Sequence, residues 1–260
     1  MPFHQPDQIR YYTFDIMEFE GVRQAVYTRR GGVSPVPWAA LNLGGTVGDD
    51  PQRVKENRSR AFQVIGCSME SMYDVWQVHS SEVVCTDRPR LPDARHLQAD
   101  AILTDTPGVT LFMRFADCVP IMLHDPQKKV VGLVHAGWKG TVDHIVSIAV
   151  QTMQAKYYTR PEDIRACVGP SIGAHHYEIG PEVAARVHAA FGQDAGALLS
   201  THNGSSVHFD LWEANRLLLE RAGVQHIQVA GICTACHLDD WYSHRGEKGK
   251  TGRFGVVIGL

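Results

Sequence analysis

The sequence predicts a mixed α/β fold in which mixed β-sheet layers are flanked by helices. Two observations support this prediction. Several short apolar runs are typical of strands, and the segments between them have apolar residues that recur at helical spacing. No internal repeat, low-complexity tract or linker interrupts this pattern, so we expect one domain over residues 1–260. A chain of 260 residues is long enough to bury a sizeable core.

The N-terminal quarter is expected to contain two strands and one helix. Residues 11–16 and 22–28 are strand-like. Asp50 is the expected N-cap of the helix, Pro51 occupies its first position, and Gly66 ends it. This helix is expected to belong to the scaffold.

The next segment is dominated by strand-like runs. Residues 75–81 and 82–86 are expected to pair with each other, and residues 99–104 form a further strand. The nearly continuous apolar run over residues 109–115 predicts a central strand that is buried on both faces.

A predicted β-hairpin organises the rest of the chain. Cys118 opens the apolar run 119–124, and His135 closes the run that begins at Val130. If the two runs pair antiparallel about the polar turn between them, the start of the first and the end of the second lie at the same end of the sheet. We therefore expect Cys118 and His135 to meet in space.

The C-terminal half alternates helices and strands. The expected elements are a helix that begins at Thr141 or Asp143 with an apolar stripe to Met153, a strand over 164–168, a helix from Gly180 to Phe191, a helix capped by Asp210, a strand over 225–232 and a last strand over 254–260. Residues 192–206 are polar and contain glycine, and they are expected to be the most mobile segment. Residues 233–253 are expected to form a loop rich in charges.

The composition excludes several functional classes. The chain has 25 basic and 28 acidic residues, a net charge of −3, so no field suited to nucleic acid or a membrane is expected. No apolar stretch approaches the roughly 18–20 residues of a membrane helix, and residues 1–7 do not resemble a signal peptide. A cytoplasmic location is therefore expected, with the six cysteines mostly as free thiols. The fourteen histidines invite a search for a metal site.

Cys118 and His135 allow two different chemistries. A neighbouring imidazolium lowers the pKa of a thiol, so the pair could form a thiolate nucleophile. With one further histidine, the same two residues could hold Zn²⁺ in a three-ligand site whose open position polarises a water or phosphate oxygen. The spacing does not choose between them, because ligands from distant parts of a chain leave no local pattern.

Two further motifs are weaker. Arg29 and Arg30 begin a glycine-rich turn that could present N–H groups and a guanidinium to an anion, although its composition favours a plain surface turn. Cys233, Cys236 and His237 match the C-x-x-C-H pattern of haem attachment. Without an export signal or a second C-x-x-C, a structural or incidental cysteine pair is favoured.

Several segments resemble the signature segments of the YfiH family, also called the multicopper polyphenol oxidoreductase or laccase-domain family. They occur in order over almost the whole chain. The principal ones are Gln77-Val78-His79, Ala116-Asp117-Cys118-Val119-Pro120 and His135-Ala136-Gly137-Trp138-Lys139-Gly140-Thr141. Supporting matches lie at residues 28–34, 42–44, 169–173, 242–245 and 251–253.

The resemblance implies a YfiH-like fold and a zinc site with His79, Cys118 and His135 as ligands, with copper as the alternative metal. It further implies an enzyme whose partners are a purine nucleoside and phosphate. Such an enzyme would phosphorylyse adenosine, inosine, guanosine and methylthioadenosine and would deaminate adenosine. The implied catalytic residues are the three ligands and Arg29, which would contact phosphate or substrate. The implied substrate-binding residues are Arg29, Asn42, Lys139, Ser171, Tyr242 and Arg245.

Three other functions remain as alternatives. The family resemblance also suggests a peptidoglycan-editing hydrolase that acts on a wrongly loaded muropeptide precursor, and a copper-dependent polyphenol oxidase. The oxidase needs more clustered ligands than the three assigned here. A metal-stabilised binding protein without turnover is the non-enzymatic alternative. The sequence leaves the oligomeric state open.

Overall fold

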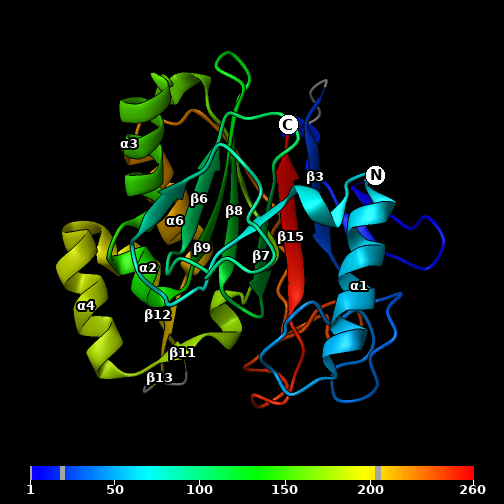
Figure 1. The fold of residues 1–260 in the computed structure, drawn as a ribbon. Helices are drawn as coiled ribbons and strands as arrows, with labels where there is room; N and C mark the ends of the chain where they lie inside the picture. Colours follow the sequence, from blue (N-terminus) through cyan, green and yellow to red (C-terminus); the bar gives the residue numbers. More distant parts are fainter. Residues whose placement is uncertain (1, 18–20, 203–205) are drawn as a thin grey trace.

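Two large mixed sheets face each other and carry helices on both outer sides (Figure 1). The computed structural model describes residues 2–17, 21–202 and 206–260. In spatial order, the strands of the first sheet are β1 (Phe3–His4), β2 (Tyr11–Tyr12), β3 (Arg23–Tyr27), β15 (Phe254–Gly259), β7 (Thr110–Phe115) and β4 (Met72–Asp74). Those of the second sheet are β14 (His226–Val229), β10 (Arg165–Val168), β8 (Val119–Asp125), β9 (Val130–Ala136), β6 (Ala101–Thr104) and β5 (Val83–Cys85). A small third sheet contains β11 (Glu178–Ile179), β13 (Ser206–Phe209) and β12 (Leu199–His202).

Helices cover the outer faces of the two large sheets. The α-helices are α1 (Pro51–Val64), α2 (Trp138–Val142), α3 (Ile145–Tyr157), α4 (Pro181–Phe191), α5 (Ala195–Leu198) and α6 (Leu211–Arg221). Short 3₁₀ helices are η1 (Asp15–Met17), η2 (Met69–Ser71), η3 (Pro161–Asp163), η4 (Ala174–His176) and η5 (Gly192–Asp194). In the described part of the chain, none of these helices is long and apolar enough to cross a membrane.

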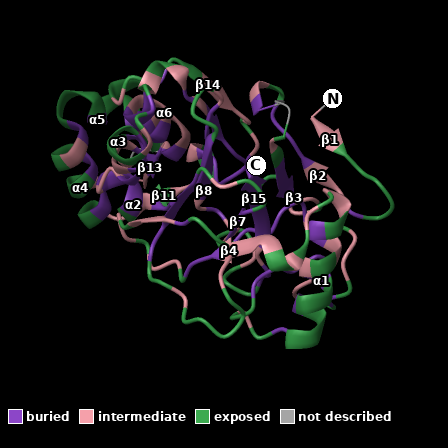
Figure 2. Cartoon of the chain, turned by 45° about the horizontal axis from the view of Figure 1, so that its top comes forward, coloured by how far each residue is buried: buried purple, intermediate pink, exposed green. Residues whose placement is uncertain are grey.

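The core has three parts that follow this layering. Between the sheets, Met113 of β7 and Val256 of β15 pack in one cluster with Leu133 of β9. Helices α3 and α6 close the other face of the second sheet, and α1 closes the first sheet through Phe62. Figure 2 shows the central strands as buried and much of α1 and α4 as exposed. This arrangement confirms the predicted mixed α/β class.

The central hairpin and the first helix form as predicted. Strands β8 and β9 pair antiparallel, with Val119 opposite Ala136. The Asp50 side chain caps α1 by accepting hydrogen bonds from the backbone N–H groups of Gln52, at 2.8 Å, and Arg53, at 3.2 Å. The start of β8 and the end of β9 therefore lie at one end of the second sheet.

The predicted pairing of residues 75–81 with 82–86 is wrong. The first strand of this region is β4, which runs parallel to β7 in the first sheet, whereas β5 runs parallel to β6 in the second. Residues 75–81 form only an isolated bridge, between Trp76 and Gln98, and Asp100 accepts hydrogen bonds from the N–H groups of Val78 and Ser80. His79 between them has a left-handed backbone with a φ of 59°. The Asp100 side chain, just before β6, therefore takes the place of a strand partner.

Two smaller predictions also need correction. Only Tyr11 and Tyr12 of residues 11–16 form a strand, because the Gln24 side chain bonds both backbone groups of Phe14 and the chain then turns into η1. The helix expected from Thr141 or Asp143 is two helices, α2 and α3, separated where His144 has a φ of 60°. The segment 192–206 contains η5, α5 and β12, and its residues 203–205 lie outside the described residues; its expected mobility stays a prediction.

Candidate functional site

His79, Cys118 and His135 converge at the end of the second sheet. One potential ligand atom from each lies within 4.8 Å of those of the other two. The Cys118 Sγ is 3.8 Å from His79 Nε2, and the rings of His79 and His135 have centroids 5.0 Å apart. The expected meeting of Cys118 with His135 is thus confirmed, and a second imidazole stands beside them.

Two residues with a left-handed backbone conformation help to bring these side chains together. His79 and Asp117, which precedes Cys118, have φ values of 59° and 79°, a conformation that is uncommon for residues other than glycine and that clusters at functional sites. The Asp117 carboxylate is held on both oxygens. It accepts hydrogen bonds from Thr234 Oγ1 at 2.7 Å and from the Arg245 N–H at 2.6 Å. The corner that presents Cys118 is therefore fixed by the loop that follows β14.

Asp100 orients two of the three converging residues. Its Oδ1 lies 2.8 Å from His135 Nδ1, and its Oδ2 accepts hydrogen bonds from the N–H groups on either side of His79. A carboxylate on the outer nitrogen of a ligating histidine fixes the tautomer and the ring orientation. Asp100 was not among the predicted site residues. It lies 35 positions from His135, so no local pattern links the two.

The charges in this cluster favour a thiolate at Cys118. Burial alone would raise the pKa of the Cys118 thiol, but the charge of His135 and hydrogen bonds from His135 and His79 lower it to about 6. Burial opposes a charge on His135, but the Cys118 thiolate and Asp100 raise its pKa to about 9. Burial also disfavours the Asp100 carboxylate, yet the hydrogen bond from His135 lowers its pKa to about 2. The deprotonated sulfur is the form that binds metal or acts as a nucleophile.

The three residues form part of the wall of a cavity of about 690 Å³. Most other lining side chains are charged or aromatic, and they include Arg58, Asp74, Trp76, Arg114, Asp117, Tyr177, Arg245 and Arg253. The carboxylates are already occupied, since Asp74 pairs with Arg114 at 2.8 Å and with Arg90 at 2.7 Å. The wall as a whole is therefore suited to an anion.

Arg58 is a largely buried cation of this wall. Burial and the nearby charge of Arg114 lower the pKa of its guanidinium to about 10, so it stays protonated at neutral pH. Its Nε and Nη2 donate hydrogen bonds to the Leu43 carbonyl at 3.0 and 2.9 Å. A turn with Gly44, Gly45 and Thr46 lines the cavity next to it.

The predicted substrate-binding residues differ in whether they line the cavity. Arg245 lines the cavity. Asn42 lies behind the wall, where its Oδ1 accepts hydrogen bonds from the N–H groups of Gly44 and Arg253. Lys139 is exposed in α2, outside the lining. Ser171 and Tyr242 are buried outside it, with Ser171 Oγ bonded to Trp212 and the Tyr242 hydroxyl donating to the Trp38 carbonyl.

Arg29 also lies outside the cavity lining, and its guanidinium is engaged by protein atoms. Its Nε donates to the Ala39 carbonyl at 2.8 Å, and its Nη1 donates to the Leu238 carbonyl at 2.9 Å and to Glu247 Oε1 at 3.0 Å. It also lies over the Tyr242 ring. Through these contacts Arg29 connects the loop after β3 to the loop before β15. Contact of Arg29 with phosphate stays a prediction.

Comparison with known proteins assigns the chain to one protein family. Residues 23–260 match the family model described as multi-copper polyphenol oxidoreductase laccase. A Deinococcus radiodurans protein named purine nucleoside phosphorylase is 43% identical over 239 residues, which cover 92% of this chain and 89% of that protein. The Bacillus subtilis purine nucleoside phosphorylase YlmD is 36% identical over 243 residues, which cover 90% of this chain and 86% of that protein.

Solved structures show the same fold. The crystal structure of the Bacillus licheniformis hypothetical protein YfiH matches with a TM-score of 0.92 and 31% identity, over 100% of this chain and 99% of that one. YlmD from Geobacillus stearothermophilus also gives a TM-score of 0.92, with 33% identity over 99% of this chain and 98% of its own.

Proposed function

Because the chain belongs to the multi-copper polyphenol oxidoreductase laccase family and matches the YfiH structure over its whole length, we propose that it is a metal-dependent purine nucleoside phosphorylase that also deaminates adenosine. One observation carries the proposal. A thiolate and two imidazoles converge on the wall of an arginine-rich cavity of about 690 Å³, within the range of about 300–1,000 Å³ typical of small-molecule sites. Relatives named purine nucleoside phosphorylase support the choice of substrate.

The three converging residues fit a catalytic metal site. Zinc in such sites has three protein ligands and one open position, and cysteine with histidine is a usual donor set. His79, Cys118 and His135 would hold the ion, with Asp100 orienting His135. Cysteine and histidine also suit copper, which stays the alternative metal. When bound, the ion supplies a Lewis acid that polarises an oxygen and lowers the pKa of a bound water.

The arginines of the wall would place the phosphate. In phosphorolysis an anion attacks the anomeric carbon while the purine leaves, so the anion must be held close to the sugar. Guanidinium groups bind phosphate through charge-assisted N–H donors, and the bonds of Arg58 to the Leu43 carbonyl use only its Nε and Nη2. Arg58 and Arg253 lie on the same side of the cavity as the glycine turn 44–45, since the Arg253 side chain lies against Gly44 and Arg58 lies near Gly45. We assign the phosphate to this group.

The aromatic residues of the wall would bind the purine. Trp76 lines the cavity with 49% of its surface exposed, and Tyr177 lines it beneath the Arg245 guanidinium. Every purine has an aromatic face, and stacking on such side chains stabilises it without selecting one base. This fits a broad set of substrates that includes adenosine, inosine, guanosine and methylthioadenosine.

The direct test is to incubate the zinc-loaded protein with adenosine, with and without phosphate. With phosphate we expect adenine, inosine and hypoxanthine. Without phosphate, base release should stop while inosine still forms, because hydrolysis of the amino group consumes only water. The proposal fails if the zinc-loaded protein yields neither free base nor inosine.

The alternative reactions predict different products from the same preparation. A polyphenol oxidase consumes oxygen in the presence of phenols and copper. A peptidoglycan-editing hydrolase releases an amino acid from an aberrant muropeptide precursor. Either result in the absence of base release would replace the proposed activity.

A further inference from the structure

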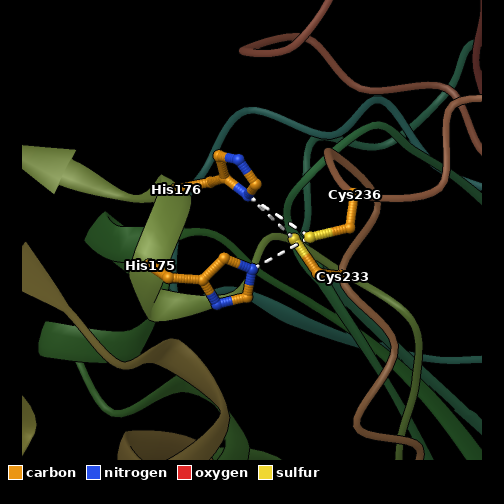
Figure 3. Close-up of side chains that lie close together, drawn as sticks. All are labelled: His175, His176, Cys233 and Cys236. Carbon is orange, nitrogen blue, oxygen red and sulfur yellow. Dashed lines mark hydrogen bonds between the residues drawn. The ribbon is translucent and has the colours of Figure 1, made fainter.

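We propose that His175, His176, Cys233 and Cys236 form a second, structural metal site that binds Zn²⁺. One potential ligand atom from each of these residues lies within 4.8 Å of those of the other three. Figure 3 shows both imidazoles directed at the two sulfur atoms. The histidines belong to η4 and the cysteines to the loop after β14, about 60 positions later in the sequence.

The distances suit a tetrahedral ion. Cys233 Sγ and Cys236 Sγ both lie 3.6 Å from His176 Nδ1, and Cys236 Sγ lies 3.0 Å from His175 Nε2. Zinc bonds of about 2.3 Å to sulfur and about 2.0–2.1 Å to nitrogen would place tetrahedral ligands about 3.3–3.8 Å apart. The two 3.6 Å separations already have that value, and the Cys236–His175 separation of 3.0 Å needs to widen by about half an ångström.

The donor set indicates a structural rather than a catalytic ion. Two cysteines and two histidines fill all four positions around zinc, which is the arrangement of closed, structural sites. Two thiolates balance the charge of the ion, and each thiol releases one proton when it binds. The backbone N–H of Gly173 donates to Cys233 Sγ at 3.2 Å and would stabilise charge on that sulfur. Cys233 is buried and the other three residues are exposed, so solvent reaches the site from one side.

The site lies directly behind the wall of the first cavity. Tyr177, which lines that cavity, follows His176, and Thr234, which holds the Asp117 carboxylate, follows Cys233. An ion bound by both segments would fix the Tyr177 and Asp117 sides of the cavity relative to each other. The two sites share no ligand, so this inference does not depend on the reaction assigned to the first.

The test is the zinc content of the intact protein after equilibration with Zn²⁺ and removal of unbound metal. We expect two zinc ions per chain in the wild type, one in Cys236→Ser, one in Cys118→Ala and none in the double variant. His237→Ala is the matched control, since His237 is an exposed neighbour outside the cluster, and it should keep two ions. If Cys236→Ser retains two ions, the second site is refuted.

A second measurement keeps the test decisive if Cys236→Ser does not fold. Crystals of the zinc-loaded wild type should give an anomalous peak at the zinc absorption edge between the four side chains, in addition to one at Cys118. Absence of the first peak refutes the proposal. A disulfide between Cys233 and Cys236 in zinc-loaded protein prepared under reducing conditions also refutes it.

Discussion

The Asp100 carboxylate lies 2.8 Å from His135 Nδ1 through one oxygen and holds the loop of His79 through the other. A single buried side chain thus sets the positions of two imidazoles that are 56 positions apart in the sequence. The geometry of these two proposed ligands therefore depends on Asp100.

Replacing Asp100 by Asn should weaken zinc binding at the first site by about 10- to 100-fold. The amide cannot accept all the hydrogen bonds of the carboxylate, so the His135 ring and the His79 loop lose their fixed orientation. Competition with a chromophoric chelator measures the affinity. Ser80→Ala removes only one of the bonds to Asp100 and should have a smaller effect. Wild-type affinity in Asp100→Asn would contradict this role.

A methyl group at Gly137 should disturb the same site. A Cβ there would lie 3.0 Å from Cys118 Sγ and 3.1 Å from His79 Cδ2, closer than ordinary contacts allow. We expect Gly137→Ala to lower zinc affinity at the first site about tenfold, since metal ligands tolerate displacements of only about 0.5 Å. Gly196→Ala is the control, because a Cβ there meets nothing within 4 Å. Equal affinities in the two variants would show that the ligands are not held against Gly137.

Arg58→Gln should raise the KM for phosphate by about 10- to 100-fold, because a charged hydrogen bond contributes about 1.5–3 kcal/mol. Deamination of adenosine needs no phosphate and should change much less. Arg53→Gln, an exposed substitution on the same helix, serves as the control. If the KM for phosphate is unchanged in Arg58→Gln, the phosphate binds elsewhere in the cavity.

Arg29→Lys should lower stability by about 2 kcal/mol in urea unfolding. Lysine cannot reproduce the fork that meets Ala39, Leu238 and Glu247, and Glu247 is left with a poorer partner. Arg30→Lys is the control, because its pair with Asp240 is more exposed and should contribute little. A raised KM for phosphate with unchanged stability would instead support the phosphate contact that the family resemblance implies for Arg29.

The sequence predicted the parts of this protein that local patterns determine. The β8–β9 hairpin and the meeting of Cys118 with His135 followed from two apolar runs around one polar turn. His79 was assigned as a ligand only through the family resemblance, because its left-handed loop is fixed by Asp100, a residue about 20 positions away that precedes β6. The same hydrogen bonds explain why residues 75–81 were wrongly assigned to a strand.

Contacts between distant segments explain the other omissions. The arginines of the cavity come from α1, β7 and the loop before β15, and no spacing connects them. The C-x-x-C pair was interpreted as structural or incidental because the sequence has no export signal and no second C-x-x-C, whereas the groups beside it are the adjacent histidines 175 and 176, about 60 positions earlier. The contact of Arg29 with phosphate or substrate came from the family segment and stays a prediction; in the structure its donors face protein oxygens.

The central claim is that His79, Cys118 and His135 hold an ion that purine nucleoside phosphorolysis requires. Phosphate-dependent release of adenine from adenosine tests it most directly, measured on chelator-treated protein before and after zinc is restored, with the metal content determined in both states. We expect the activity to disappear with the metal and to return with zinc in the wild type but not in folded Cys118→Ala. Full adenine release by protein shown to be free of metal would contradict the claim.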